Sequence, residues 1–351
     1  MDRKRITWYT EQLIDDYIWV SDFRYNALFR ISTEFGDAEY VGSFLGENSD
    51  ARELHLSSIR NGTKIYFLPQ HAKTIGGFDT DKNEFFSIEC EKNINENTTI
   101  INAFDYAGYL WLVPRYLDIP IQALDVNGDK VVKRISFEKK LDLASRNEYQ
   151  LLYACMINGK ILAPIHNTNK IIRFSPDDES IEIKEIAGLS RITGAVASVR
   201  QGVWISTDKG VYTIDKNNKI DRLSEDYLKE GNWIEAFIES DNKIVCVPRW
   251  IDKVAVYDLD TMSVKYIELN DTPINTRNDL DWKWRDFKSC MLSKDVLTIS
   301  PLRFSEALVI NIESGSITQK SYKYPKKFNP FKSSIAYEVD NSSLSDFISF
   351  I

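Results

Sequence analysis

The chain has 351 residues, of which 43% are hydrophobic and 12% aromatic, so a sizeable core is available. Its formal net charge of −8 at pH 7 argues against bulk attraction to nucleic acid or to an anionic membrane. No apolar run approaches the roughly 18 residues of a membrane span, and the N-terminal stretch lacks the apolar core of a secretory signal. We therefore expect a cytoplasmic monomer with no nucleic-acid or membrane partner. A chain whose natural signal peptide had been removed would have the same sequence.

The dominant pattern along the chain is a short apolar run that recurs seven times, as in YIWVSD, KIYFLP and KIVCVP. Successive runs end 41 to 53 residues apart. Each run follows a pair of residues, such as Asn-Gly or Asp-Asn, that suits a tight hairpin turn. The last residues of the seven runs are Asp22, Pro69, Pro114, Pro164, Thr207, Pro248 and Pro301.

Each recurring run belongs to a unit of four short strands, which we name A, B, C and D in chain order. The recurring run is strand B, and the third unit shows all four strands as IINAFDY, YLWLVP, IQALDV and KVVKRIS. Four antiparallel strands repeated about every 40–50 residues are typical of a β-propeller. We predict an all-β protein of seven four-stranded antiparallel blades, with short helices only in the connections Lys139–Tyr149 and Ser224–Gly231. The alternatives are six or eight blades, or two independent β-sandwiches, which a repeat crossing every plausible boundary disfavours.

The repeat ends before the chain does. Residues 1–323 are expected to form one propeller domain, and residues 324–351 form a tail with a different pattern. The tail begins as a connector and continues as two predicted strands, Ser334–Val339 and Phe347–Ile351. We expect these strands to form a hairpin that clasps the ring where its first and last blades meet. An incomplete eighth blade is the alternative.

Two segments resemble the strand-turn-strand portion of the Kelch repeat: FDTDKNEFFSI (Phe78–Ile88) and YDLDTMSVKYIEL (Tyr257–Leu269). In both, an aromatic residue and an aspartate lead through a turn to a further aromatic residue. The chain has a proline followed by another residue, as in Pro248-Arg249, where a Kelch repeat has two glycines, and the later Kelch tryptophan is absent. The resemblance implies a propeller fold. This fold hosts enzymes and adaptors alike, so it does not choose the function.

The turns between strands B and C carry basic residues. Because the strands of a blade alternate in direction, these turns and the D-to-A crossovers share one face of the ring, here called the B–C face. Within two positions of the end of strand B, every unit has a cation or a histidine: Arg24, His71, Arg115, His166, Lys209, Arg249 and Arg303. Neighbouring turn residues and the long crossover Asn270–Asp286 add Tyr25, Tyr116, Trp250, Trp282, Trp284 and Arg285.

An arginine beside an aromatic plane suits carboxylates, phosphates and the polar surfaces of sugars or peptides. We therefore expect noncatalytic recognition of an anionic or polar ligand, or of an acidic partner protein, on the B–C face. The alternative is a propeller-type lyase or hydrolase that acts on acidic carbohydrate or peptide, with His71 or His166 in acid–base work. Solvated turns, or cations that discourage pairing of strand edges, would give the same pattern.

Motifs for catalysis or metal binding are missing from the sequence. It contains no GxSxG, HExxH or P-loop pattern. Four widely separated cysteines form no CxxC pair, so neither a metal site nor a cofactor is expected. The third histidine, His55, falls on a predicted inner strand and is expected in the core or the channel. The acidic turns DTDKN and SPDDE complete no calcium loop.

Overall fold

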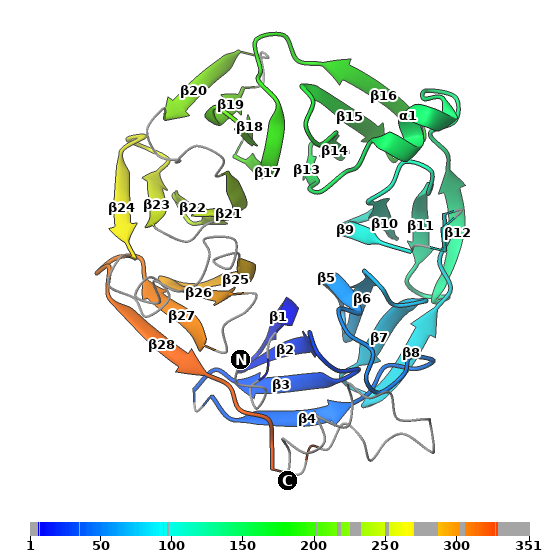
Figure 1. Cartoon of the computed structure of the whole chain (residues 1–351), viewed down its shortest axis with the longest axis vertical. Coiled ribbons are helices and arrows are strands. Elements are labelled where there is room, and N and C mark those ends of the chain that lie inside the picture. The colour runs from blue at the N-terminus through cyan, green and yellow to red at the C-terminus, as the bar shows by residue number, and fades with distance from the viewer. Residues whose placement is uncertain are drawn as a thin grey trace.

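The computed structural model of the chain is a ring of seven four-stranded antiparallel sheets around a central axis (Figure 1). It describes residues 6–328, apart from residues 7, 35, 94, 97, 201, 216–218, 225–232, 250–252, 270–286, 302–305 and 327. The predicted seven-bladed all-β propeller is thereby confirmed, and six blades, eight complete blades and two sandwiches are excluded as descriptions of the described residues.

Each blade consists of four strands that are consecutive in sequence, in the order A, B, C and D from the axis outward. Blades 1 and 2 are β1 (Trp8–Ile14), β2 (Tyr17–Asp22), β3 (Leu28–Ser32) and β4 (Ala38–Gly42), then β5 (His55–Asn61), β6 (Lys64–Pro69), β7 (Ile75–Asp79) and β8 (Glu84–Ile88). Blades 3 and 4 are β9 (Ile100–Tyr106), β10 (Tyr109–Pro114), β11 (Ile121–Asp125) and β12 (Lys130–Ile135), then β13 (Cys155–Ile157), β14 (Lys160–Pro164), β15 (Lys170–Ser175) and β16 (Ser180–Glu185). Blades 5 and 6 are β17 (Ile192–Val199), β18 (Gly202–Thr207), β19 (Gly210–Ile214) and β20 (Ile220–Ser224), then β21 (Ile234–Ser240), β22 (Lys243–Pro248), β23 (Lys253–Asp258) and β24 (Val264–Glu268). Blade 7 is β25 (Phe287–Ser293), β26 (Val296–Pro301), β27 (Glu306–Asn311) and β28 (Ile317–Ser321).

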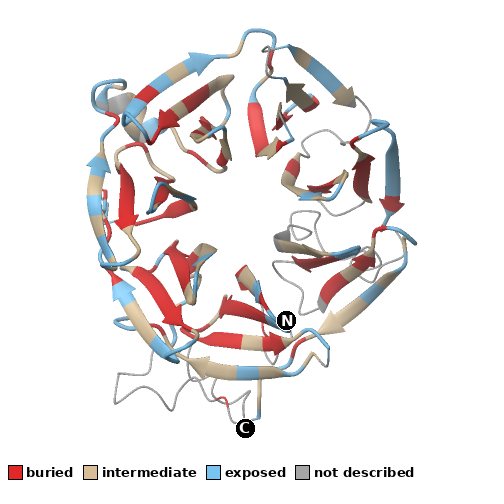
Figure 2. Ribbon diagram, turned by 180° about the vertical axis from the view of Figure 1, so that it is seen from behind, coloured by how far each residue is buried: buried red, intermediate tan, exposed pale blue. Residues whose placement is uncertain are grey.

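The recurring run of the sequence is the second strand of every blade. All seven recurring end residues, from Asp22 to Pro301, are the last residues of B strands. These strands are buried almost throughout, whereas the outer D strands are mostly exposed or half-buried (Figure 2). Neighbouring blades cover both faces of the middle strands, and the hydrophobic clusters therefore lie between blades. Trp111 of blade 3 and Phe174 of blade 4, with ring centroids 5.0 Å apart, belong to one such cluster.

The ring closes between blade 1 and blade 7. The backbone N–H of Ile6 donates to the carbonyl of Tyr322 at 2.8 Å, just beyond β28. Tyr324 and Phe328 then pack on blade 1, where the Phe328 ring lies 5.0 Å from the ring of Phe29. The connector that follows the last blade therefore helps to close the ring. The predicted clasping strands at 334–339 and 347–351 lie outside the described residues.

One helix, α1 (Leu143–Glu148), lies within the first of the two connections predicted to be helical. Asp142 caps it by accepting a hydrogen bond from the backbone N–H of Ser145 at 2.7 Å. Residues 225–231 of the second predicted helical connection lie outside the described residues. No helix in the described part of the chain is both long and apolar enough to cross a membrane.

Candidate functional site

Two basic residues of the B–C face are held together by the chain that enters blade 4. Arg115 follows β10, and its Nε and Nη2 donate to the side-chain oxygen of Gln150 at 3.3 and 3.2 Å. The backbone carbonyl of the same Gln150 accepts a hydrogen bond from the N–H of His166 at 2.9 Å. Leu151, the next residue, donates to the carbonyl of Arg115 at 2.8 Å. The turns of blades 3 and 4 therefore lie side by side, with Arg115 and His166 near each other.

A third basic residue reaches this site from blade 6. The Arg249 guanidinium carbon lies 4.5 Å from the centre of the Trp233 ring, a cation–π arrangement. The backbone N–H of Arg249 donates to the Trp233 carbonyl at 2.9 Å. The Trp233 indole in turn donates to Glu235 Oε2 at 3.0 Å. These contacts hold Arg249 over the start of β21, the innermost strand of its blade.

Arg115 and Arg249 both lie within electrostatic reach of His166. His166 is half-buried, and burial together with the positive charges of Arg115 and Arg249 lowers the pKa of its imidazole. The ring therefore stays neutral at pH 7. Among the described residues it has no side-chain hydrogen-bond partner. A neutral imidazole within reach of two guanidinium groups can accept a hydrogen bond or a proton from a bound molecule.

Tyr153 connects the blade 4 side of the site to blade 6. Burial and the nearby Glu235 carboxylate raise the pKa of the Tyr153 phenol well above its ordinary value. The phenol therefore keeps its proton and can donate to an acceptor. Since Tyr153 also feels the charge of Arg249, the starts of the inner strands of blades 4 and 6 lie close to each other near the axis.

A glycine of blade 5 makes room for this arrangement. A Cβ added to Gly194 would lie 2.3 Å from the carbonyl oxygen of Ile234 and 2.7 Å from Trp233 Cδ1. Neither backbone nor ring could stay in place at such distances. The absence of a side chain on β17 thus allows Trp233 to come close to blade 5. Ser206 of the same blade accepts a hydrogen bond from the N–H of Ile234 at 2.8 Å.

A cavity of about 540 Å³ adjoins these residues on the side of the central channel formed by blades 3 to 6. Its walls come from the inner strands of blades 3, 4, 5 and 6. Apolar side chains such as Phe104, Met156 and Phe237 line it, together with the polar residues Tyr153 and Glu235. Because Tyr153 and Glu235 also adjoin the basic residues, the cavity and the B–C face are continuous at this point. We call Arg115, His166 and Arg249 the basic mouth of the channel.

The other described basic turn residues do not join the basic mouth. Arg24 lies near the junction of blades 1 and 7, called here the seam, and its backbone N–H donates to Asp22 Oδ1 at 2.8 Å. His71 is exposed, with Nε2 3.9 Å from Glu53 Oε2. Lys209 is exposed in the tight turn between β18 and β19. The ring of seven basic positions therefore divides into three that converge and three that do not, and Arg303 lies outside the described residues.

The aromatic candidates divide in a similar way. Tyr116 is half-buried with the Arg115 guanidinium carbon 5.7 Å from its ring centre, which places it beside the basic mouth. Tyr25 is only 4% exposed and packs against Tyr324 and Phe328, so it belongs to the core at the seam and not to the surface of the B–C face. Four further candidates lie outside the described residues: Trp250, Trp282, Trp284 and Arg285.

Sequence reasoning missed the residues that support the basic mouth: Gln150, Tyr153, Trp233 and Glu235. All four stand just before or at the beginning of an inner strand, in crossovers whose sequences do not repeat from blade to blade. The prediction that crossovers share a face with the B–C turns was the available signal. That prediction applied to Trp233 and Gln150 as much as to the crossover Asn270–Asp286, but candidates were chosen only from the latter because it is rich in aromatic residues.

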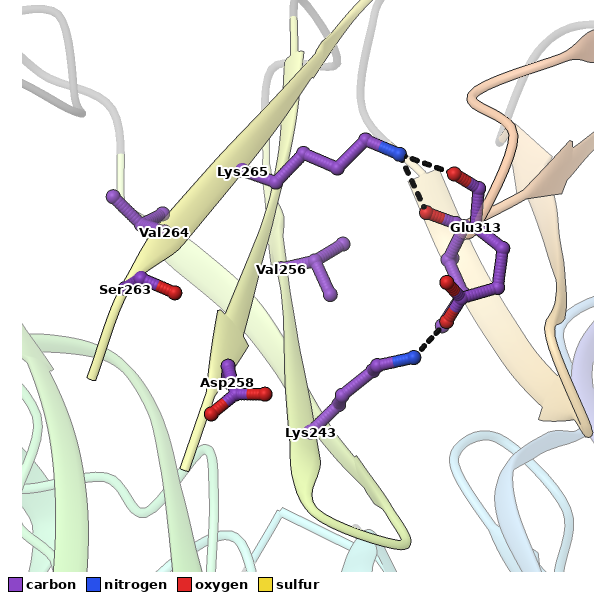
Figure 3. Close-up of a pocket in the computed structure, with 8 residues that line it drawn as sticks. Lys243, Val256, Asp258, Ser263, Val264, Lys265 and Glu313 are labelled. Carbon is purple, nitrogen blue, oxygen red and sulfur yellow. Dashed lines mark hydrogen bonds and ion pairs between the residues drawn. The ribbon is translucent and has the colours of Figure 1, made fainter. Parts of the chain in front are cut away.

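A second, smaller cavity of about 140 Å³ lies between blades 6 and 7 on the opposite face of the ring. Lys243 forms an ion pair with Glu313, and Lys265 Nζ donates to the carbonyls of Ile312, at 3.2 Å, and Glu313 (Figure 3). Both lysines are thus used to join the two blades. This cavity is a structural contact and offers little to a ligand.

The remaining titratable groups offer no further centre in the described part of the chain. His55 is 3% exposed, accepts or donates a 2.8 Å hydrogen bond with Ser21, and has a pKa lowered by burial to about 3. Cys90, Cys155 and Cys246 are buried free thiols. Nowhere among the described residues do three side chains of the kinds that ligate metals gather.

No protein-family model matches the chain, and no curated protein is significantly similar in sequence. The resemblance to Kelch repeats therefore remains one of short segments. Solved structures show the same fold. Virginiamycin B lyase from Staphylococcus aureus has a TM-score of 0.64 and 11% identity, over 86% of this chain and 93% of the lyase.

Two other similar structures are parts of larger bacterial proteins. PorZ, a surface component of the type-IX secretion system of Porphyromonas gingivalis, has a TM-score of 0.62 and 9% identity, over 93% of this chain and 39% of PorZ. The extracellular domain of a putative hybrid two-component system from B. thetaiotaomicron has a TM-score of 0.59 and 13% identity, over 88% of this chain and 39% of that domain. At these identities the likeness concerns the fold alone.

Proposed function

We propose that the protein binds the anionic end of a small ligand at the basic mouth, with the body of the ligand in the channel. The observation that carries the proposal is the convergence of Arg115, His166 and Arg249 from three blades above one cavity. Arg115 bonds an amide oxygen and has no carboxylate partner among the described residues. Its positive charge is therefore not neutralised by an ion pair there, and a ligand carboxylate or phosphate can supply the missing negative charge.

The dimensions of the site favour a small molecule over a protein surface. Its cavity of about 540 Å³ is within the usual range of about 300–1,000 Å³ for small-molecule sites. A protein-binding face would instead present a broad, shallow and aromatic surface. Apolar walls with a few polar groups are also typical of ligand sites, because the apolar groups contribute affinity and the polar groups fix orientation.

The proposal is tested by isothermal titration calorimetry with hexanoate, a carboxylate with an apolar body, and with inorganic phosphate as an anion lacking that body. Hexanoate is expected to bind, and Arg115→Gln with Arg249→Gln to weaken it well over tenfold, since a charge-assisted hydrogen bond contributes about 1.5–3 kcal/mol. The thermal midpoint is expected to change little, because turn positions make few core contacts.

A matched control uses basic residues of the opposite face. Arg60→Gln with Lys130→Gln removes two exposed positive charges from A–B and C–D turns and should leave hexanoate binding unchanged. If hexanoate does not bind, or if both double variants weaken it equally, the proposal is wrong. Phosphate that binds as well as hexanoate would show that the channel contributes nothing and that the mouth alone is the site.

The position of His166 supports a second candidate function, in which the protein is an enzyme that uses acid–base catalysis at the same ligand site. The neutral, half-buried ring of His166 beside two guanidinium groups could take a proton from a bound anion whose charge the arginines stabilise. One structure of virginiamycin B lyase, which has the same fold, contains quinupristin and a catalytically inactive histidine-to-alanine variant. The test is to incubate each probe that binds with the protein and search for products by mass spectrometry. Products that disappear with His166→Ala would favour catalysis, and unaltered probes would favour binding alone.

A further inference from the structure

A carboxylate lines the cavity next to the basic mouth, and a site with both charges favours a particular class of ligand. Glu235 lines the cavity at the start of β21. Its carboxylate affects both Tyr153 of blade 4 and Cys290 of blade 7. Blade 4 does not adjoin blade 6, so the interaction between Glu235 and Tyr153 must cross the cavity near the axis. Glu235 therefore faces the interior of the ring.

A second carboxylate adds to this negative region. Glu11, on the inner strand of blade 1, accepts a hydrogen bond from the Trp8 indole. Together with burial, Glu11 and Glu235 raise the pKa of the Cys290 thiol well above its ordinary value, so the two carboxylates lie on either side of blade 7 within electrostatic reach of it. Charges in a narrow space walled by protein act more strongly than in bulk water. In the wall of the cavity, Glu235 thus places a negative charge close to the positive mouth.

The surroundings of Glu235 suit a cationic group. Phe104 and Phe237 line the same cavity, and aromatic faces attract ammonium groups. Asn102, also in the lining, has a side-chain oxygen that accepts a hydrogen bond from the Ala103 N–H at 3.2 Å and retains a second lone pair. A carboxylate, an amide oxygen and aromatic rings around one cavity form a favourable site for a protonated amine.

We propose that the ligand is zwitterionic: its carboxylate lies at Arg115 and Arg249, and a protonated amine lies deeper in the channel at Glu235. This inference rests on the proposed function, since it assigns the second end of the same ligand. Free amino acids, short peptides with charged ends and other aminocarboxylates belong to this chemical class. A ligand with opposite charges at its two ends would interact favourably with both the arginines and Glu235, and a simple anion would bind more weakly because it lacks the second interaction.

The experiment compares matched pairs of probes by isothermal titration calorimetry. The aminocarboxylates γ-aminobutyrate, ε-aminocaproate and ω-aminooctanoate are each titrated against the alkanoate of equal length, and hexylamine serves as the probe without a carboxylate. At least one aminocarboxylate is expected to bind tenfold or more tightly than its alkanoate. Glu235→Gln, which keeps the size of the side chain, should reduce that advantage to threefold or less and leave the affinity for the alkanoate unchanged or improved.

The matched control is Glu239→Gln, an exposed glutamate toward the other end of the same strand. It should preserve the advantage of the amine, and circular dichroism should show that both variants keep the strand content of the parent. An advantage that survives Glu235→Gln, or alkanoates that bind as tightly as every aminocarboxylate, would overturn the inference and leave the proposed function standing if hexanoate binding still requires the two arginines. Failure of all the carboxylates to bind would overturn both, and so would binding of hexylamine alone.

Discussion

The two faces of the ring use their charged residues for different purposes. On the face of the A–B and C–D turns, basic residues of one blade pair with acidic residues of the next: Lys64 with Asp129, Arg200 with Asp260, and Lys243 with Glu313. On the B–C face, Arg115 bonds an amide and the His166 ring stays neutral within reach of two arginines. The first arrangement joins blades and neutralises charge, and the second concentrates positive charge over a cavity.

The acidic residues of the C–D turns take part in these contacts between blades, and in the SPDDE turn Glu179 pairs with Lys133 of blade 3 at 2.7 Å. Asp129, Asp260 and Glu313 stand in C–D turns, where the neighbouring blade supplies a cation. Acidic residues in these turns therefore serve the contact between blades. At the basic mouth, Arg115 bonds the amide of Gln150, and Glu235 belongs to the cavity wall and accepts a hydrogen bond from Trp233.

The largest effect is expected at the junction of blades 1 and 7, where residues near the B–C face stabilise the fold. Phe328 is 6% exposed and its ring contacts those of Tyr25, Phe29 and Tyr40. Phe328→Ala should lower the free energy of unfolding by about 3–5 kcal/mol, the usual cost of removing a buried aromatic ring. Urea unfolding followed by tryptophan fluorescence measures the change. A decrease below about 1 kcal/mol would show that the connector does not hold the seam.

The next largest effect concerns Asp22, whose contribution to the free energy of unfolding depends on pH. Burial raises the pKa of this carboxyl from 3.8 to about 7, and its oxygens accept hydrogen bonds from the N–H groups of Arg24 and Tyr25 and from the Tyr324 hydroxyl. Between pH 4 and pH 7 the folded protein therefore holds a proton that the unfolded chain releases. The contribution of Asp22 to stability is greatest in acid, falls as the pH rises to 7 and is constant above it. One pKa unit corresponds to about 1.4 kcal/mol, so the total loss approaches about 4 kcal/mol.

The check is to compare the pH dependence of unfolding of the parent and of Asp22→Asn. Asparagine keeps an oxygen for the two backbone N–H groups and cannot ionise. The variant should gain stability relative to the parent as the pH rises from 4 to 7, with no further gain from 7 to 8. Parallel stability curves over the whole range would show that Asp22 titrates normally in the folded protein.

The smallest predicted effect concerns the opposite face. Lys243→Met removes the ion pair with Glu313 and should lower the free energy of unfolding by up to about 1 kcal/mol, because partly exposed ion pairs contribute little. It should leave the affinity for hexanoate unchanged. A tenfold change in that affinity would contradict the division of labour between the two faces, since Lys243 lies far along the blade from the basic mouth.

The sequence allowed the fold to be predicted because its determinants are local. Alternating apolar residues, Asn-Gly-type turns and the recurring strand ends from Asp22 to Pro301 each depend on residues close together in the chain. The site was harder to predict because the basic turn residues come together only where a turn extends far enough toward the axis of the ring. Position in the repeat placed Arg115 and Arg24 on one face, but it could not show that Arg24 lies beside Tyr324 at the junction of the first and last blades. Trp233 was missed because the crossovers do not repeat.

Every blade is made of four strands that are consecutive in the chain, and this has a consequence for synthesis on the ribosome. Each sheet can complete its hydrogen bonds as soon as its fourth strand has emerged, before the next blade is translated. Its apolar faces, however, wait for neighbours. Blade 2 soon covers one face of blade 1, but the other face packs against Ala307, Tyr322 and Phe328. For most of translation the nascent chain therefore exposes the aromatic surface around Phe29, which is the kind of surface that chaperones bind. The first blade to be made is the last to be covered.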